Sequence, residues 1–187
     1  DYGSGNAGTT NVMRTLGKKA GIATYLLDAF KAVIADILIH FLIVPHTAIP
    51  EMLLFLYCGL GIVLGHNFPF YLKFKGGKGI AASSGVVLSL MRFPKYCFMF
   101  TVFGIFFFAL VARISRYVSL ASLIGMAMFF VEFLIWGFLG WLPLNGTDLV
   151  EGTVIVFALA ALAFIRHRSN IVRLVHGTER KIGEKKN

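Results

Sequence analysis

The chain has 187 residues, of which 57% are apolar and only 14% are charged, whereas about a quarter are charged in typical soluble domains. Its mean hydropathy is +0.77 and its formal net charge is +9. The length fits one domain, and the composition excludes an ordinary soluble one. Because the basic residues stand in short loops between apolar runs, they favour anionic lipid or an anionic substrate over nucleic acid.

Several apolar runs approach the length of about 20 residues that crosses a bilayer as a helix. A shorter run, 79–91, favours a short or re-entrant helix packed against protein. The sequence therefore predicts an all-α membrane protein, a polytopic helical bundle with about six membrane helices in this chain. The other five are expected at 20–44, 51–72, 96–112, 117–142 and 149–165.

Lysine and arginine are concentrated in alternate connections. If 79–91 and 96–112 form a hairpin, the basic segments all lie on one side of the membrane. The positive-inside rule makes that side cytoplasmic, with Arg92 and Lys95 as an exception on the other side. Fifteen of the 18 Lys and Arg residues stand in 1–19, 73–78, 113–116 and 166–187, and none stands in 45–50 or 143–148.

The first polar constellation is Gly3-Ser4-Gly5-Asn6-Ala7-Gly8-Thr9-Thr10-Asn11, followed by Arg14. Glycines let the backbone approach a ligand closely, and the polar side chains supply neutral hydrogen bonds. Arg14 can hold a phosphate through two N–H groups. The alternative is a flexible loop that caps the next helix.

The second constellation is the stretch 65–79, GHNFPFYLKFKGGKG, where three lysines and three glycines fall within Lys73–Gly79. Backbone N–H and ammonium groups of this kind converge on anions. A Walker A pattern is absent, so nothing indicates a nucleotide. His66 either orients this loop, contacts substrate or is structural, and the whole stretch has the alternative of a basic cytoplasmic turn.

The third constellation, RHRSNIVRLVHGTERKIG, begins at Arg166 as the last apolar run ends. Ile171, Leu174 and Val175 recur at helical spacing, which predicts an amphipathic helix at the membrane interface. A basic anchor to anionic lipid is the alternative, although such an anchor has no need of His167 and Asn170.

Charged residues inside the apolar runs indicate function by default. Asp28 and Lys31 are three residues apart on one helix face, so we expect a buried pair that braces the site, with Lys31 able to reach substrate. Asp36 and Glu132 receive no role from the sequence.

These three constellations, in this order, resemble the PlsY family of bacterial membrane-integral acyltransferases, from residue 1 to about residue 183. The resemblance implies a seven-helix fold in the bacterial inner membrane with its active site facing the cytoplasm. It implies transfer of an acyl chain from acyl-phosphate to the 1-hydroxyl of sn-glycerol 3-phosphate, giving lysophosphatidic acid and phosphate in the first acylation step of phospholipid synthesis. We expect one membrane-integral domain over 1–187 that lacks the family's first membrane helix, with a cytoplasmic basic tail at 166–187.

The resemblance also implies the site. The expected partners of the protein are the two substrates and membrane lipids. No cofactor, metal or nucleic acid is expected, and the oligomeric state stays open. The expected catalytic residues are Lys78, His167 and Ser4. The glycerol 3-phosphate site is expected at Ser4, Arg14, Lys78, His167 and Asn170, and the acyl-phosphate site at His66, Lys75, Gly76, Gly77, Lys78 and Gly79.

An acyl-phosphate is already activated, so its transfer requires mainly that two anions are held close together. The proton acceptor stays open among His167, His66 and the substrate's own phosphate. The competing hypothesis from another class is an anion transporter, which predicts polar groups distributed across the bilayer and internal repeats.

Overall fold

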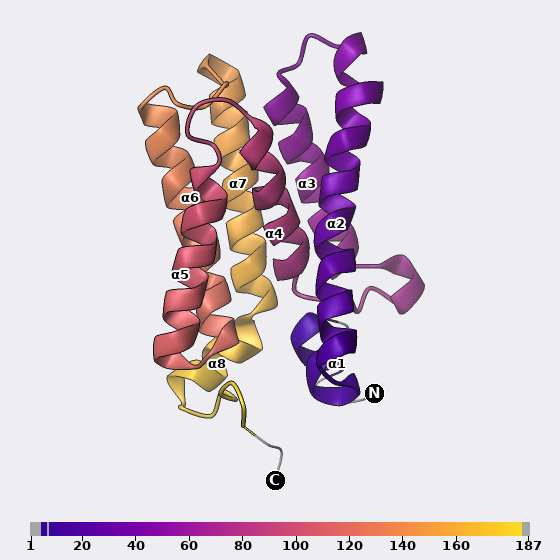
Figure 1. Cartoon of the computed structure of the whole chain (residues 1–187), viewed down its shortest axis with the longest axis vertical. Coiled ribbons are helices and arrows are strands. Elements are labelled where there is room, and N and C mark those ends of the chain that lie inside the picture. Colours follow the sequence, from indigo (N-terminus) through magenta and orange to yellow (C-terminus); the bar gives the residue numbers. More distant parts are fainter. Residues whose placement is uncertain (1–4, 7, 185–187) are drawn as a thin grey trace.

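The structure is a computed structural model that describes residues 5–6 and 8–184. Within those residues every regular element is a helix, as the sequence predicts (Figure 1). Short 3-10 turns occupy Val44–His46, Phe70–Leu72 and Leu90–Arg92. The α-helices are α1 Thr9–Leu16, α2 Lys18–Leu42, α3 Glu51–Asn67, α4 Ile80–Ser89, α5 Met99–Ser115, α6 Val118–Phe138, α7 Gly146–Arg166 and α8 Arg168–Val175.

The long helices run nearly parallel to one axis and form a bundle (Figure 1). Among the described residues, three segments are long and apolar enough to cross a bilayer, namely Glu51–Leu72, Val118–Phe138 and Gly146–Arg166. Ile80–Arg92 and Met99–Ser115 are shorter apolar helices. The 25-residue α2 is long enough to cross but carries charged residues, which lowers its hydropathy.

The helix ends differ from the sequence predictions where backbone chemistry intervenes. The run predicted over 51–72 ends as an α-helix at Asn67, because the residue before Pro69 is disfavoured in helical conformation. The run predicted over 117–142 ends at Phe138, just before Gly140 adopts a left-handed conformation.

Helices α2 and α4 approach each other backbone to backbone. A Cβ on Gly85 of α4 would collide with the carbonyl group of Ala29 in α2, so only glycine permits this contact. The close approach places Asp28 and Lys31 of α2 beside the segment that leads into α4.

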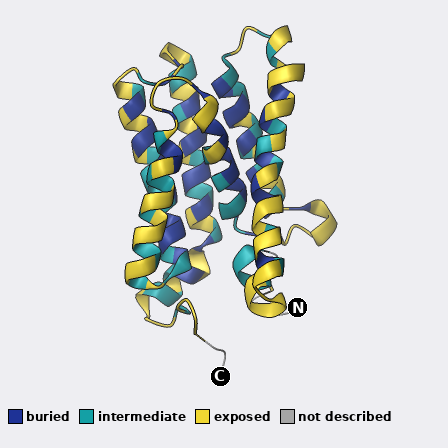
Figure 2. Cartoon of the chain, in the orientation of Figure 1, coloured by how far each residue is buried: buried dark blue, intermediate teal, exposed yellow. Residues whose placement is uncertain are grey.

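Aromatic packing forms much of the core between α5 and α6. The Phe100 ring is 1% exposed and lies edge-on to Phe129 and Trp136, with centroid separations of 5.4 and 4.6 Å. By contrast, Phe98 and Phe106 are exposed on the outside of the bundle. Figure 2 shows this division along the bundle, where buried residues face inward and exposed residues face outward.

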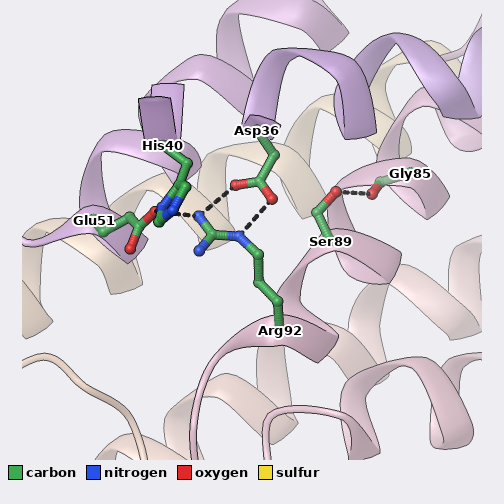
Figure 3. A network of polar contacts seen from close by, with 6 residues as sticks. All are labelled: Asp36, His40, Glu51, Gly85, Ser89 and Arg92. Atoms are coloured by element: carbon green, nitrogen blue, oxygen red, sulfur yellow. Dashed lines mark hydrogen bonds and ion pairs between the residues drawn. The ribbon is translucent and has the colours of Figure 1, made fainter. Parts of the chain in front are cut away.

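A polar network closes the end of the bundle opposite α1 and α8 (Figure 3). Arg92 donates two hydrogen bonds to the buried carboxylate of Asp36, at 2.6 and 2.8 Å, and a third to Glu51 at 2.7 Å. Glu51 also contacts His40. This network gives the Asp36 carboxylate a structural partner and explains why Arg92 stands at the end of the bundle away from the basic segments.

The predicted gathering of basic segments at one end of the bundle is confirmed. Helix α1, the turn after α5 and helix α8 all lie at the lower end in Figure 1, because α4 and α5 form the expected hairpin. The Arg116 backbone and side chain bond to Ile182, which ties the C-terminal segment to the turn between α5 and α6.

Candidate functional site

A polar cleft of about 360 Å³ opens at the basic end of the bundle. A cleft of this size suits a small ligand. It is bordered by parts of all three polar constellations, which are far apart in the sequence. The lining residues are Gly5, Asn6, Phe74, Lys75, Gly76, Lys78, Arg166, Ser169 and Arg173.

Gly76 lines this cleft, and both glycines of the pair in the second constellation pack closely against His66. A Cβ on Gly76 would overlap the backbone of His66, and one on Gly77 would overlap the His66 ring. Gly79 has a φ of 83° and precedes the first residue of α4. Each glycine therefore permits a conformation or a contact that a side chain would prevent.

The backbone hydrogen bonds of Gly76 and Gly77 modify the expectation that the N–H groups of these glycines bind an anion. The N–H groups of Gly76 and Gly77 donate to the carbonyl oxygens of Asn67 and His66, both at 3.2 Å. Their own carbonyl oxygens accept hydrogen bonds from Arg166 at 3.0–3.2 Å. The two amides are thus engaged within the protein, so their role is to shape the loop that presents Lys78.

Lys78 is held from the opposite side by α8. Its Nζ donates to the side-chain oxygen of Asn170 at 2.5 Å, and the Asn170 amide donates to Glu179 at 2.6 Å. The Glu179 carboxylate also accepts hydrogen bonds from Ser119 at 2.8 Å and from Arg173 at 2.7 Å. This chain of contacts joins the second and third constellations and orients Asn170 toward Lys78.

The electrostatics around Lys78 are strongly positive. Burial lowers the pKa of Lys78 to about 8; the Glu179 carboxylate opposes this shift, and the cations of Arg173, Arg14 and Arg166 reinforce it. Glu179 is itself held ionised, because its hydrogen bonds outweigh the effect of burial and keep its pKa below the usual range. Four cations around one carboxylate leave an excess of positive charge that suits a phosphate group.

His167 lies buried at the end of α7, with 3% of its surface exposed. Its Nδ1 lies 2.7 Å from the Ala163 carbonyl oxygen, which can only accept, so Nδ1 carries the proton. Burial lowers the pKa of His167 to about 4, and the Lys78 cation acts in the same direction, while the Ala163 hydrogen bond opposes it. The ring is therefore neutral, with Nε2 free to accept a hydrogen bond.

The first constellation is only partly described. Ser4 lies outside the described residues, so the structure gives it no position. Arg14 stands on α1, close enough for its charge to act on Lys78. Asn6, from the same motif, lines the cleft.

The expected pairing of Asp28 and Lys31 is confirmed, with 2.6 Å between the carboxylate and Nζ, but the pair is only partly buried, because 39% of the Lys31 side chain is exposed. The same Asp28 oxygen lies 3.2 Å from Nδ1 of His66, a contact that the sequence spacing could not predict. Seven residues of the described site were not among those expected from the sequence, although each stands inside a motif that it singled out. They are Gly5, Asn6, Phe74, Arg166, Ser169, Arg173 and Glu179.

Comparisons with known proteins identify the family of this chain. The family model described as glycerol-3-phosphate acyltransferase matches residues 1–177. The chain belongs to the glycerol-3-phosphate acyltransferase family. It is 40% identical over 185 residues to the glycerol-3-phosphate acyltransferase of Thermoanaerobacter sp. (strain X514), covering 99% of this chain and 82% of that protein. With the enzyme of Clostridioides difficile (strain 630) it shares 39% identity over 186 residues, covering 98% and 81%.

Solved structures of this family share the fold. One is PlsY (YgiH), an integral membrane glycerol 3-phosphate acyltransferase, in its glycerol 3-phosphate form, with a TM-score of 0.79 and 33% identity over 97% of this chain and 80% of that one. The lysophosphatidic acid form gives a TM-score of 0.77 at the same identity, covering 96% and 81%. The family resemblance inferred from the three motifs is confirmed, and this acyltransferase family member is an integral membrane protein.

Proposed function

We propose that this protein transfers an acyl chain from acyl-phosphate to the 1-hydroxyl of sn-glycerol 3-phosphate, releasing lysophosphatidic acid and inorganic phosphate. The observation that carries the proposal is the cation cluster around Lys78, because both proposed substrates bear a phosphoryl group. Lys78 stands between the glycine loop and α8, where it can contact an anion on each side.

The acceptor phosphate is assigned to the side formed by α1 and α8. Arg14 and Lys78 supply charge there, and Asn170 and the neutral Nε2 of His167 supply hydrogen-bonding groups. We assign Ser4 to this half as well, because the motif that contains it resembles the family's motif. Because Nε2 of His167 is an acceptor, it suits the hydroxyl group of glycerol 3-phosphate.

The donor phosphate is assigned to the loop side, with Lys75 and Lys78 on the cleft and Gly76, Gly77 and Gly79 shaping the backbone. The first N–H groups of α4, which follow Gly79, have no partner within the helix and carry the positive end of its dipole. His66 supports this half of the site through its contact with Gly77.

In the proposed reaction the acceptor oxygen forms a bond to the donor carbonyl carbon, and the bond from that carbon to the phosphate oxygen breaks. Lys78 stabilises the charge on the leaving phosphate. A histidine with a pKa of about 4 is a weak base near neutral pH, so His167 orients the hydroxyl and a phosphate oxygen takes the proton. Removing one such electrostatic donor costs about 10²–10³ in rate.

The distribution of basic residues supports a cytoplasmic location for the site. Among the described residues, the end of the bundle that holds the cleft also holds 13 of the 16 Lys and Arg residues, so the positive-inside rule assigns this end to the cytoplasm. We assign the protein to the bacterial inner membrane, as one acyltransferase domain whose basic segment 166–187 faces the cytoplasm.

The test is a donor comparison with purified protein in lipid nanodiscs. Acyl-phosphate, acyl-CoA and acyl carrier protein are each supplied with radiolabelled glycerol 3-phosphate. We expect product only from acyl-phosphate, with one phosphate released per acyl group transferred. Lys78→Ala should abolish this activity, whereas Glu132→Ala in α6 should retain most of it. Equal loss in both variants, or no phosphate release by the unmodified protein, would overturn the proposal.

A further inference from the structure

The segment behind the donor loop contains a cluster whose chemistry the proposed reaction does not use. Asp28 and Lys31 project from α2, and His66 stands on the last turn of α3. The Asp28 and His66 side chains are 12% and 9% exposed, so the carboxylate and the imidazole are largely shielded from solvent. A buried carboxylate needs partners, and here it has two.

The contact distances select one arrangement of the protons. Nδ1 of His66 lies 3.2 Å from Oδ1 of Asp28 and 3.5 Å from Nζ of Lys31. Lys31 already donates to the same carboxylate oxygen at 2.6 Å. Because a carboxylate can only accept, the shorter contact places a proton on Nδ1.

The other edge of the ring lies against the donor loop. Nε2 is the atom nearest to the position where a Cβ on Gly77 would stand. Gly77 is held in addition by the His66 carbonyl oxygen and by Arg166, and the next residue is Lys78. The ring is therefore a spacer between Asp28 and the backbone that carries Lys78.

We propose that Asp28 and Lys31 are positioning residues for the donor half of the site, acting through His66. Asp28 fixes the tautomer and orientation of the imidazole, Lys31 keeps the carboxylate ionised, and the fixed ring sets the position of the Gly77–Lys78 backbone. The acceptor half is held separately, by the Asn170 and Glu179 contacts. This inference rests on the proposed function, since it takes the loop side to be the acyl-phosphate side.

The kinetic test uses Asp28→Asn, His66→Leu and the double variant, with both substrates varied. Loss of a charge-assisted hydrogen bond predicts that Asp28→Asn raises the KM for acyl-phosphate about tenfold or more, and changes the KM for glycerol 3-phosphate less than about twofold. Because Asp28 acts through the ring, Asp28→Asn should add nothing in the His66→Leu background. Additive effects, or equal rises in both KM values, would overturn the inference.

Asp36→Asn is the matched control. It changes another buried aspartate of α2, about two turns further along the helix, whose partner is Arg92 at the opposite end (Figure 3). This variant should lower thermal stability while leaving both KM values unchanged. A donor KM that rises equally in Asp36→Asn would show that Asp28 acts only through general stability.

A readout without substrate separates this inference from the proposed function. In ¹⁵N-histidine spectra, the His66 signal, identified by its loss in His66→Leu, should report a proton on Nδ1 in the unmodified protein, and Asp28→Asn should shift that equilibrium. A ring that carries its proton on Nε2 and none on Nδ1 in the unmodified protein would overturn the inference even if acyl-phosphate is the donor. If acyl-phosphate is not the donor, the unmodified protein shows no turnover while the spectra still report the tautomer.

Discussion

The lowered pKa of Lys78 predicts how activity depends on pH. Burial brings this pKa to about 8, so the ammonium group of the free enzyme loses its proton within a range that the assay can reach. The cationic form attracts phosphate, so kcat/KM for glycerol 3-phosphate should fall as the pH rises through about 8. Near pH 9 about one tenth of the enzyme retains the cation, and kcat/KM should be close to one tenth of its plateau.

The bound complex should behave differently. A phosphate dianion beside Lys78 favours the charged form and raises its pKa, so kcat should stay level to a higher pH than kcat/KM does. The assay is product formation in nanodiscs between about pH 6.5 and 10, at saturating donor, corrected for donor hydrolysis without enzyme.

Lys78→Arg provides the matched control, because a guanidinium stays charged over the whole range. The variant should be slower, since it alters the contact with Asn170, but its kcat/KM should remain level through about pH 10. A level profile in the unmodified protein, or the same fall in the Arg variant, would refute the assignment of this titration to Lys78.

Three further predictions concern residues on and away from the cleft. Arg92→Met should lower the stability of the protein by about 3 kcal/mol in thermal unfolding, because it leaves the Asp36 carboxylate buried without its main partner, while the remaining folded enzyme stays active. Glu132→Leu should raise the melting temperature of the protein or leave it unchanged, because neither carboxylate oxygen of Glu132 has a hydrogen-bond partner among the described residues. The variant should also keep the full turnover rate. A large loss of turnover would assign Glu132 to the site. Gly77→Ala should reduce kcat/KM about 100-fold through displacement of the loop, whereas Gly61→Ala in α3, where a Cβ meets nothing within 4 Å, should have no such effect.

The sequence predicted the helical elements well because lipid imposes one simple requirement on the chain. Every membrane-crossing segment must satisfy its backbone hydrogen bonds internally and present apolar side chains, so hydropathy alone locates it. The helix ends were less predictable, since they depend on local breaks such as those at Pro69 and Gly140. The run 79–91 was correctly predicted to form a short helix, because it is shorter than the runs that cross a bilayer.

The residue types of the candidate site were predictable from the sequence, but the contacts among those residues were not. Clustered Gly, Lys and Asn residues at the ends of apolar runs indicated anion binding, and the structure brings Lys78 and Asn170 into contact. The sequence could not show that the Gly76 and Gly77 amides bond to nearby carbonyl groups, because that depends on how the loop folds back on α3. Nor could it pair Asp28 with His66, since their contact depends on the packing of α2 against its neighbours.

The central claim is that Lys78 stands between the two substrate phosphates. The most direct measurement is a solved structure of the protein with glycerol 3-phosphate and a non-hydrolysable acyl-phosphonate bound together. The account predicts an oxygen of each phosphoryl group within about 2.7–3.2 Å of Lys78 Nζ, with the phosphonate on the side of the glycine loop and glycerol 3-phosphate toward α8. Either phosphoryl group bound out of reach of Lys78 would contradict it.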